Sequence, residues 1–322
     1  MTTTPMPKRV PGQPPTLALG AMNFGKRTPA AESERIVRRA LERGIRVFDT
    51  ANVYNAGESE RILGRALGRE RESVVLATKV GMDRVGGAIE GLSPEAMERA
   101  LFGSLDRLGA SSVDVYYLHA PDHVTPIERT LDGMRALVDS GRVKAWGVSN
   151  YSSWQILDMH ALSDARGLAR PVVSQVLYNA LHRQLDIEYF AFTRRHPIHT
   201  TVYNPLAGGL LTGKHTFEGA PGKGSRFDEN AIYRRRYWTR AMFDRVAQVR
   251  VVAEQEGRSL VDFSYAWVAS RPDVDSILVG PATVEQLDQA IDAVGRPLSG
   301  DSLARIDELG REWSGTDTAY VR

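Results

Sequence analysis

Residues 113–119 read VDVYYLH, residues 143–149 read VKAWGVS, and the stretch between them, residues 126–140, reads PIERTLDGMRALVDS. The two outer runs are almost continuously apolar, which is typical of parallel strands that are covered on both faces. The middle stretch has the 3.6-residue period of a helix. Together the three segments predict a strand–helix–strand unit, which is the element from which parallel α/β folds are built.

The same alternation continues in both directions along the chain. Apolar runs comparable to strands occur at residues 16–22, 46–51, 74–80, 113–119, 143–149, 172–177, 200–204 and 276–280. Helical patterns occur at residues 33–43, 93–109, 126–140, 152–165, 284–294 and 302–309. Eight strands that alternate with helices predict an α/β fold of the (β/α)8 barrel type, with the active site at the strand ends. A doubly wound sheet is the alternative, but no G-x-G-x-x-G turn follows the first strand.

The gap between the seventh and eighth strands is long, and it contains a Gly-rich loop, a basic-aromatic segment and two expected helices. Residues 1–15 are Thr- and Pro-rich and are expected to form a flexible lead-in, which leaves residues 16–322 as a single barrel domain. No leader resembling a secretion signal is visible, so a cytoplasmic location is expected.

Composition excludes several classes of function. The 322 residues include no cysteine, which rules out disulfides, thiolate nucleophiles and iron–sulfur clusters. The formal charge of +2 is small for a nucleic-acid binder, and no apolar run is long enough to span a membrane. No histidine pair has metal-ligand spacing such as H-E-x-x-H, so we expect no metal.

Polar side chains stand at the ends of four successive strands. Asp49 ends the second strand with Tyr54 just beyond it, Lys79 ends the third, His119 ends the fourth, and Ser149 and Asn150 end the fifth. A lone charge of this kind is often a strand-end ion pair, but four in succession indicate chemistry. An ammonium beside a tyrosine favours the phenolate, a carboxylate holds the ammonium, and a histidine orients a carbonyl. The set predicts a proton donor for carbonyl reduction, which needs a hydride-carrying cofactor.

These residues lie in motifs that resemble the aldo-keto reductase superfamily. The motifs are Phe48-Asp49-Thr50-Ala51 with Tyr54, Ala77-Thr78-Lys79, Tyr117-Leu118-His119 and Gly147-Val148-Ser149-Asn150. The resemblance extends from about Leu17 to the C-terminus. It implies a barrel that binds NADPH (NADP+) in an extended form, with Tyr54 as the general acid, Lys79 and Asp49 assisting it, and His119 positioning the carbonyl.

The resemblance also implies a cofactor site. Asn204 to Lys214, NPLAGGLLTGK, would wrap the pyrophosphate, Tyr203 would stack on the nicotinamide, and Ser149, Asn150 and Gln175 would hydrogen-bond its carboxamide. The full expected set is Gly20, Met22, Asp49, Ser149, Asn150, Gln175, Tyr203, Asn204, Pro205, Leu206, Gly208, Gly209, Leu210, Gly213, Lys214, Arg226, Gly280, Ala282, Thr283 and Gln286. Gly208 to Lys214 also approaches a phosphate-binding P-loop, but His215 replaces the Ser or Thr that would hold magnesium.

One subfamily is more similar still. Leu118 to His123, the Asn204 to Lys214 loop, Tyr233 to Trp238 and the terminal Arg322 resemble the aflatoxin-aldehyde and succinic-semialdehyde reductases. This similarity implies a homodimer that reduces small carboxylated aldehydes or dicarbonyls. It places Tyr54, His119, Tyr233, Arg236 and Arg322 around the substrate, with the C-terminal tail over the active site. Arginine forks suit carboxylates.

The sequence departs from the family at two positions. Ala290 stands where an Asn usually faces the adenine, and Ala282 replaces a common Ser, so the preference for NADPH over NADH stays open, as do the physiological substrate and the stereochemistry. Two other functions are compatible with the fold. A cofactor-binding barrel with little turnover could act as a redox sensor, and an unrelated barrel could be a phosphate-handling isomerase. The intact proton-donor set favours the reductase.

Overall fold

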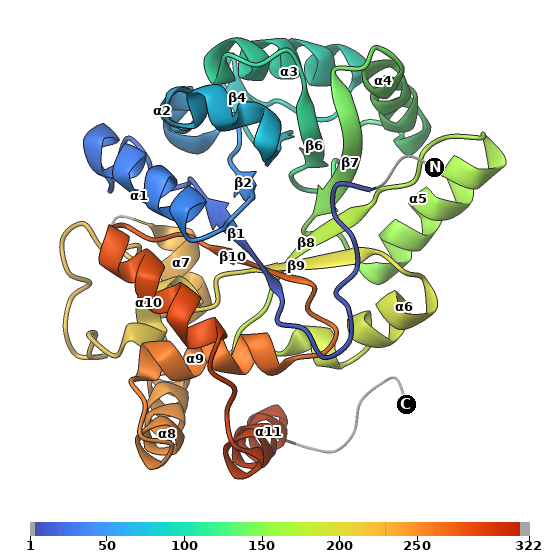
Figure 1. Cartoon of the computed structure of the whole chain (residues 1–322). Coiled ribbons are helices and arrows are strands. Elements are labelled where there is room, and N and C mark those ends of the chain that lie inside the picture. Colours follow the sequence, from blue (N-terminus) through green and yellow to red (C-terminus); the bar gives the residue numbers. More distant parts are fainter. Residues whose placement is uncertain (1–3, 229, 316–322) are drawn as a thin grey trace.

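Eight parallel strands form a closed barrel in the computed structural model, which describes residues 4–228 and 230–315 (Figure 1). The strands are β1 (Thr16–Gly20), β2 (Val47–Asp49), β3 (Val75–Val80), β6 (Val113–Leu118), β7 (Val143–Ser149), β8 (Val173–Leu177), β9 (His199–Tyr203) and β10 (Ser276–Val279). Their order around the ring is β1-β10-β9-β8-β7-β6-β3-β2. The predicted (β/α)8 barrel is therefore confirmed, and the doubly wound sheet is excluded because the sheet has no edge.

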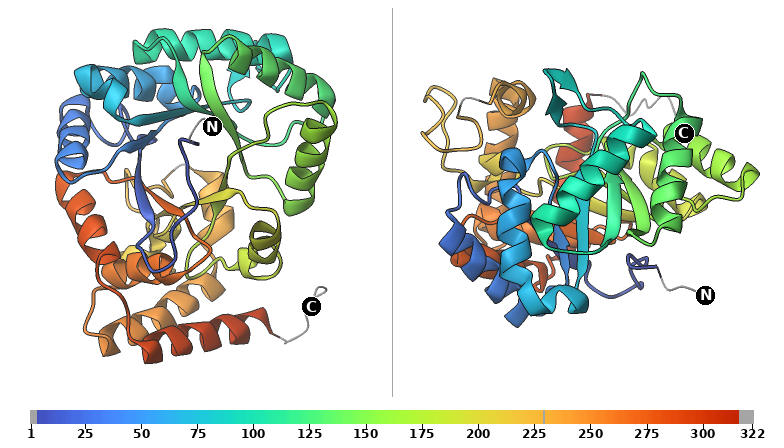
Figure 2. Two further views of the ribbon diagram at one scale, coloured as in Figure 1. Left: turned by 45° about the vertical axis from the view of Figure 1, so that its right-hand side comes forward. Right: turned by 90° about the horizontal axis from the view of Figure 1, so that it is seen from above.

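Helices surround this ring on its outer side (Figure 2). They are α1 (Ala30–Glu42), α2 (Glu58–Leu67), α3 (Pro94–Leu108), α4 (Ile127–Asp139), α5 (Ser153–Ala165), α6 (Tyr189–Arg195), α7 (Ala231–Tyr237), α8 (Arg240–Gln255), α9 (Leu260–Ser270), α10 (Val284–Val294) and α11 (Gly300–Ser314). Sequence signals set several ends. The Ser93 hydroxyl caps α3 by accepting from the Ala96 N–H at 3.2 Å, and Gly109 ends that helix in the left-handed conformation.

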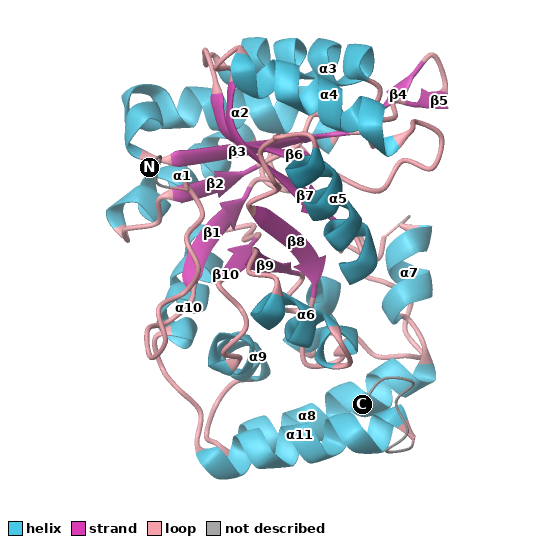
Figure 3. Cartoon of the chain, turned by 90° about the vertical axis from the view of Figure 1, so that its right-hand side faces the viewer, coloured by secondary structure: helices cyan, strands magenta, loops and turns pink. Residues whose placement is uncertain are grey.

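The structure adds elements that the sequence patterns did not predict. Helices α2 and α6 fill the positions after β2 and β8, and a two-stranded hairpin of β4 (Arg84–Val85) and β5 (Ala88–Ile89) follows β3. Among the described residues between β9 and β10 there are three α-helices where two were expected, since the basic-aromatic segment itself forms α7. Helices α8 and α11 lie side by side at the margin of the molecule (Figure 3).

The barrel interior and the helix layer have separate apolar cores. Small and β-branched side chains such as Ala18, Val47, Ala77 and Val173 fill the inside of the ring. Larger side chains, among them Trp146, pack between the strands and the helices. This division follows from the two-residue period of a strand, which sends successive side chains to opposite faces.

Within the N-terminal segment, Met6, Lys8 and Arg9 contact the barrel, and the flexibility expected of residues 1–15 stays a prediction. Met6 is 4% exposed and joins the interior core. The Lys8 ammonium lies 2.7 Å from a carboxylate oxygen of Asp275, and the Arg9 N–H donates to the other oxygen at 2.7 Å. Asp275 immediately precedes β10, so this segment crosses the amino-terminal end of the barrel (Figure 2). The opposite, carboxyl end is left for the site.

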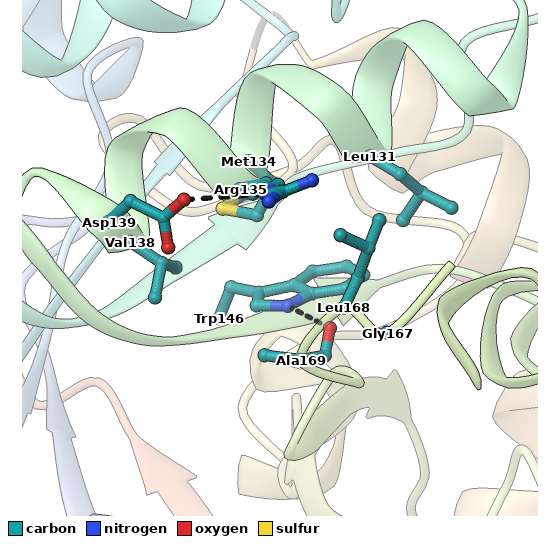
Figure 4. A pocket seen from close by; sticks show the side chains of 9 residues that line it. All are labelled: Leu131, Met134, Arg135, Val138, Asp139, Trp146, Gly167, Leu168 and Ala169. Atoms are coloured by element: carbon teal, nitrogen blue, oxygen red, sulfur yellow. Dashed lines mark hydrogen bonds and ion pairs between the residues drawn. The ribbon is translucent and has the colours of Figure 1, made fainter. Parts of the chain in front are cut away.

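A small cavity lies on the outer side of the barrel, between α4 and β7 (Figure 4). Its volume is about 140 Å³, and it is lined by Leu131, Met134, Arg135, Val138, Asp139, Trp146, Gly167, Leu168 and Ala169. The Trp146 indole N–H donates to the Ala169 carbonyl at 3.0 Å on its floor. The cavity belongs to the helix layer, so it is separate from the polar groups at the strand ends.

Two kinds of feature are absent from residues 4–228 and 230–315. No helix there combines the length and the apolar character that crossing a membrane requires. The same residues contain no group of three or more potential metal-ligating side chains.

Candidate active site

A buried ion pair lies at the carboxyl ends of β2 and β3. The Lys79 side chain is 0% exposed, and its ammonium donates to Asp49 Oδ1 and to the Thr50 carbonyl, the latter at 2.8 Å. The Gln175 amide on β8 donates to the second Asp49 oxygen at 2.9 Å. A buried charge requires such a partner and such hydrogen bonds. Three strands that are far apart in sequence thus meet at one carboxylate.

Tyr54 reaches this pair from a sharp turn after β2. It opens a short 3-10 helix, Tyr54–Gly57, in which Asn55, Ala56 and Gly57 all have positive φ, at 51°, 54° and 81°. The Asn55 amide donates to the carbonyls of Phe24 and Met22, at 2.6 and 3.1 Å, which fixes the turn against the loop after β1. The Lys79 Nζ lies 5.2 Å from the centroid of the Tyr54 ring.

The pKa of the Tyr54 hydroxyl is raised well above its usual value of 10. Burial of the hydroxyl is the larger cause, and the nearby Asp49 carboxylate is the next. The net direction is therefore opposite to the lowering expected from the sequence, because burial and the Asp49 carboxylate, which pairs with the Lys79 ammonium, both raise the pKa of Tyr54. Tyr54 keeps its proton at neutral pH and can donate it.

The imidazole ring of His119 lies next to the Tyr54 ring. Its centroid lies 5.7 Å from that of Tyr54, with the rings nearly perpendicular. Burial and the Lys79 charge lower its pKa to about 3, so the imidazole is neutral. The buried Nδ1 has no hydrogen-bond partner among the described residues. A neutral imidazole carries one N–H donor and one acceptor, which suits it to orient a carbonyl.

A chain of amide and hydroxyl groups continues from His119 along the strand ends. The Asn150 amide donates to the His119 carbonyl at 2.9 Å and to the Ser149 hydroxyl at 3.0 Å. The Tyr203 hydroxyl donates to the Asn150 side-chain oxygen at 2.6 Å. Asn150 has a φ of 66°, an uncommon conformation for a residue other than glycine. The structure thus brings Ser149, Asn150 and Tyr203 together, and their contacts with a nicotinamide stay predictions.

A second polar cluster joins the loops after β1, β9 and β10. Arg226 donates to the Asn23 side chain at 2.8 Å and to the Tyr233 hydroxyl at 3.2 Å. The Asn23 amide in turn donates to the Gly280 carbonyl at 3.0 Å, and the Asn204 amide donates to the Tyr233 hydroxyl at 3.2 Å. Burial alone would raise the pKa of Tyr233, but the Arg226 charge and hydrogen bond lower it overall. This cluster lies close enough to affect the pKa of Tyr54.

Asn23 is a member of this cluster that the sequence reasoning missed. It follows Met22, which the resemblance had placed at the cofactor, and it carries no motif of its own. Gly20 and Met22 are placed in the same region: the side chain of Met22 lies 3.7 Å from Arg226 Nη1, and Gly20 ends β1.

The Gly-rich loop after β9 forms the 3-10 helix Ala207–Thr212. Gly208 and Gly209 have φ of 69° and 103°, and a Cβ at Gly208 would lie 2.8 Å from the Tyr233 ring. Only glycine combines that conformation with that closeness. Pro205 and Leu210 are buried, whereas Leu206, Gly213 and the exposed Lys214 lie nearer the surface. The loop therefore packs on α7, and its pyrophosphate contacts stay predicted.

The start of α10 has internal partners for its free N–H groups. The Thr283 hydroxyl caps the Gln286 N–H at 3.3 Å, and the Gln286 side-chain oxygen accepts from the Ala282 N–H at 2.8 Å. Glu32 of α1 accepts from the Val284 N–H at 3.1 Å. The predicted anion site here thus requires rearrangement of these side chains. Ala290 is only 1% exposed and belongs to the apolar core.

Of the two arginines predicted to bind substrate, the structure describes Arg236 but not Arg322. Arg236 on α7 lies with its guanidinium 5.8 Å from the Tyr233 ring centroid, and its charge opposes the burial that raises the pKa of Tyr203. It therefore faces the site. Arg322 and the predicted tail over the active site lie outside the described residues.

The sequence of the chain is similar to a known protein family and to several of its members. Residues 16–311 match the Aldo/keto reductase family. Aflatoxin B1 aldehyde reductase member 2 of Rattus norvegicus is 36% identical over 91% of this chain and 84% of its own length. Aldo-keto reductase family 7 member A3 of Homo sapiens is 34% identical over 93% and 94%. A protein of Arabidopsis thaliana named probable voltage-gated potassium channel subunit beta is 34% identical over 87% of each chain. The chain therefore belongs to the aldo/keto reductase family, and within it resembles the aflatoxin aldehyde reductases.

Proposed function

We propose that the protein reduces aldehydes to alcohols with NADPH, and that its substrates are small carboxylated aldehydes or dicarbonyls such as succinic semialdehyde. The observation that carries the proposal is the grouping of the Tyr54 ring with His119 and with the buried Lys79–Asp49 pair. In this grouping the pKa of Tyr54 is raised and that of His119 is lowered. This arrangement can give a proton to a carbonyl oxygen, and the relatives named aflatoxin B1 aldehyde reductase support the reduction of aldehydes in general.

The residues fit a nicotinamide dinucleotide at two places. At the strand ends, the side-chain amides of Asn150 and Gln175 donate to His119 and Asp49 in this structure, and they would exchange such bonds for bonds to a carboxamide. Arg226 offers a guanidinium to a phosphate beside the conformationally permissive Gly208 and Gly209. When bound, NADPH supplies the hydride that becomes attached to the carbonyl carbon. A guanidinium at this position also supports a preference for NADPH, which carries an additional phosphate, over NADH.

The protein's own residues then act on the carbonyl oxygen. His119 orients it by a hydrogen bond, and Tyr54 transfers its hydroxyl proton to the oxygen as negative charge develops there. The resulting phenolate lies beside the Lys79 ammonium, which stabilises it, while Asp49 holds that ammonium in position. The phenolate afterwards regains a proton from water, so one proton and one hydride are consumed for each alcohol formed.

Turnover tests this proposal directly. Purified protein is mixed with NADPH and a panel of aldehydes, and the loss of NADPH absorbance is followed alongside chromatographic detection of the alcohol. We expect alcohol to form in equal amount to the NADPH consumed, with the carboxylated aldehydes preferred. Absence of any alcohol with every aldehyde would contradict the proposal.

One alternative is a cofactor-binding barrel with little turnover, and the plant relative is named for a channel subunit and not for an enzyme activity. In that case NADPH would bind tightly, as measured by fluorescence titration, but alcohol would form at less than one equivalent per protein.

The homodimer implied by the subfamily resemblance is also a proposal, which light scattering of the purified protein tests.

A further inference from the structure

Glu60 is a buried carboxylate that the chemistry described above does not use. It lies on α2, is 0% exposed, and accepts two short hydrogen bonds. The Thr78 hydroxyl donates to Oε1 at 2.6 Å, and the Arg107 Nε donates to Oε2 at 2.6 Å. A buried charge is costly even when it is paired, so its presence beside an active site requires an explanation.

The position of Thr78 supplies that explanation. Thr78 directly precedes Lys79 on β3, and successive side chains of a strand point to opposite faces. Lys79 therefore points into the barrel toward Asp49, whereas Thr78 points outward to Glu60. The hydrogen bond from Thr78 to Glu60 thus holds the strand that carries the ammonium, from its outer side and one residue away.

The same helix also carries the turn with the general acid. Helix α2 begins at Glu58, immediately after the 3-10 helix Tyr54–Gly57. Gly57 packs so closely on Arg107 that a Cβ at position 57 would lie 2.5 Å from Arg107 Cδ. Arg107 thus contacts both Glu60 and the residue that joins the Tyr54 turn to α2.

The neighbouring Ser59 holds the other two strands in the same way. Its hydroxyl donates to the Ala21 carbonyl after β1 at 2.7 Å. The Ser59 oxygen lies 2.8 Å from the Thr50 hydroxyl, which is therefore the donor of that bond. Thr50 directly follows Asp49, so one turn of α2 contacts the strand ends that carry Asp49 and Lys79.

We propose that Glu60 is a positioning residue, which through Thr78 fixes the distance between the Tyr54 hydroxyl and the Lys79 ammonium. This inference rests on the proposed reductase function. Such a residue acts on the rate of proton transfer and not on the affinity for substrate or cofactor, because neither contacts it. A misplacement of about 1 Å in an active site can lower the rate roughly a hundredfold.

The test is the substitution Thr78→Val, which removes the hydroxyl with little change in shape and leaves the Glu60–Arg107 pair in place. We expect kcat to fall about tenfold to a hundredfold, while KM and the Kd of NADPH change less than twofold. Thr78→Ser restores the hydroxyl and should restore kcat. The matched control is Thr193→Val on α6, which removes a buried Thr hydroxyl bonded only to the Phe190 carbonyl, at 3.2 Å, and should leave kcat unchanged.

The inference is overturned if Thr78→Val has the kcat of the parent or if Thr78→Ser does not recover the parent's kcat. It is also overturned if the control Thr193→Val loses as much kcat as Thr78→Val. Crystal structures of the parent and of Thr78→Val add a readout that does not depend on turnover. We expect the Tyr54 hydroxyl to shift relative to the Lys79 Nζ, and identical positions would contradict the inference. If the parent reduces no aldehyde, the proposed function fails by itself and this structural comparison alone decides the role of Glu60.

Discussion

The proton on Tyr54 is the residue-scale feature on which the proposed chemistry depends. It is kept by two effects that act together, the burial of the hydroxyl and the Asp49 carboxylate. Lys79 does not reverse them, since its charge is already paired. The site is thereby arranged for donating a proton at neutral pH, which is the direction that aldehyde reduction requires.

Substitution of Tyr54 by phenylalanine tests that role. Tyr54→Phe removes the hydroxyl but leaves the ring against His119. We expect kcat to fall by about a hundredfold to ten-thousandfold, the usual loss for a general acid, with NADPH binding retained. Steady-state kinetics and fluorescence titration measure the two quantities. A rate within threefold of the parent would mean that another group donates the proton.

His119 predicts a pH dependence of stability. Its pKa is about 3 in the folded protein and near 6.5 in an unfolded chain. Between these values the unfolded state binds one more proton, so the free energy of unfolding falls as pH decreases from about 6.5 toward 3. His119→Asn should remove about 1.4 kcal/mol per pH unit from that slope over pH 4–6. Urea unfolding at several pH values measures it, and parallel slopes would disprove the pKa.

At the scale of elements, the short helix α7 carries the residues on which the proposed substrate preference depends. It presents Tyr233 and Arg236 to the site, and the Gly208 and Gly209 loop packs against it. A guanidinium in this position can bind a carboxylate at a fixed distance from Tyr54. Arg235, on the same helix, is exposed and offers a comparison.

We expect Arg236→Ala to raise the KM for succinic semialdehyde about tenfold to a hundredfold, since a charge-assisted contact contributes roughly 1.5–3 kcal/mol. The KM for an uncharged aromatic aldehyde should change little. Arg235→Ala is the matched control and should alter neither value. Equal effects on both aldehydes would show that α7 binds no carboxylate.

The N-terminal segment is the second element with a measurable contribution. Met6 is buried under the barrel, whereas Val10 of the same segment is 56% exposed. Met6→Ala should lower the free energy of unfolding by about 2–5 kcal/mol, the usual cost of truncating a buried Met. Val10→Ala should change it by less than about 0.5 kcal/mol. Urea unfolding followed by circular dichroism compares them, and an unchanged midpoint in Met6→Ala would contradict the packing.

At the scale of the whole molecule, the ring of strands was predictable because continuous apolar runs are strong local signals. Helix α6 has seven residues, too few for a helical period, and α2 carries Gly64 in its middle. The Gly is explained only in three dimensions, since a Cβ there would lie 2.3 Å from the Leu108 carbonyl oxygen. The β4–β5 strands have two residues each, below any sequence pattern.

The candidate site likewise contains some residues that the sequence predicts and others that only the folded structure reveals. Asp49, Lys79 and His119 were found because they interrupt apolar runs at strand ends. Asn23 and Glu60 were not, because their roles come from loops and helices that meet only in the folded chain. The pKa of Tyr54 likewise depends on burial and on the position of Asp49, which no spacing in the sequence reveals.

The pairing of β1 with β10 has a consequence for the protein during its synthesis. Thr16 pairs with Ser276, about 260 residues later, and the Lys8–Asp275 ion pair also forms only after Asp275 has been synthesised. At ribosomal speeds of about 5–20 residues per second, β1 stays without this neighbour for more than ten seconds. Until then it has an unpaired edge, the kind of surface that recruits other chains. Nascent chains stalled at residue 270 should therefore be cut readily by protease and should engage chaperones, whereas chains stalled well beyond β10 should resist.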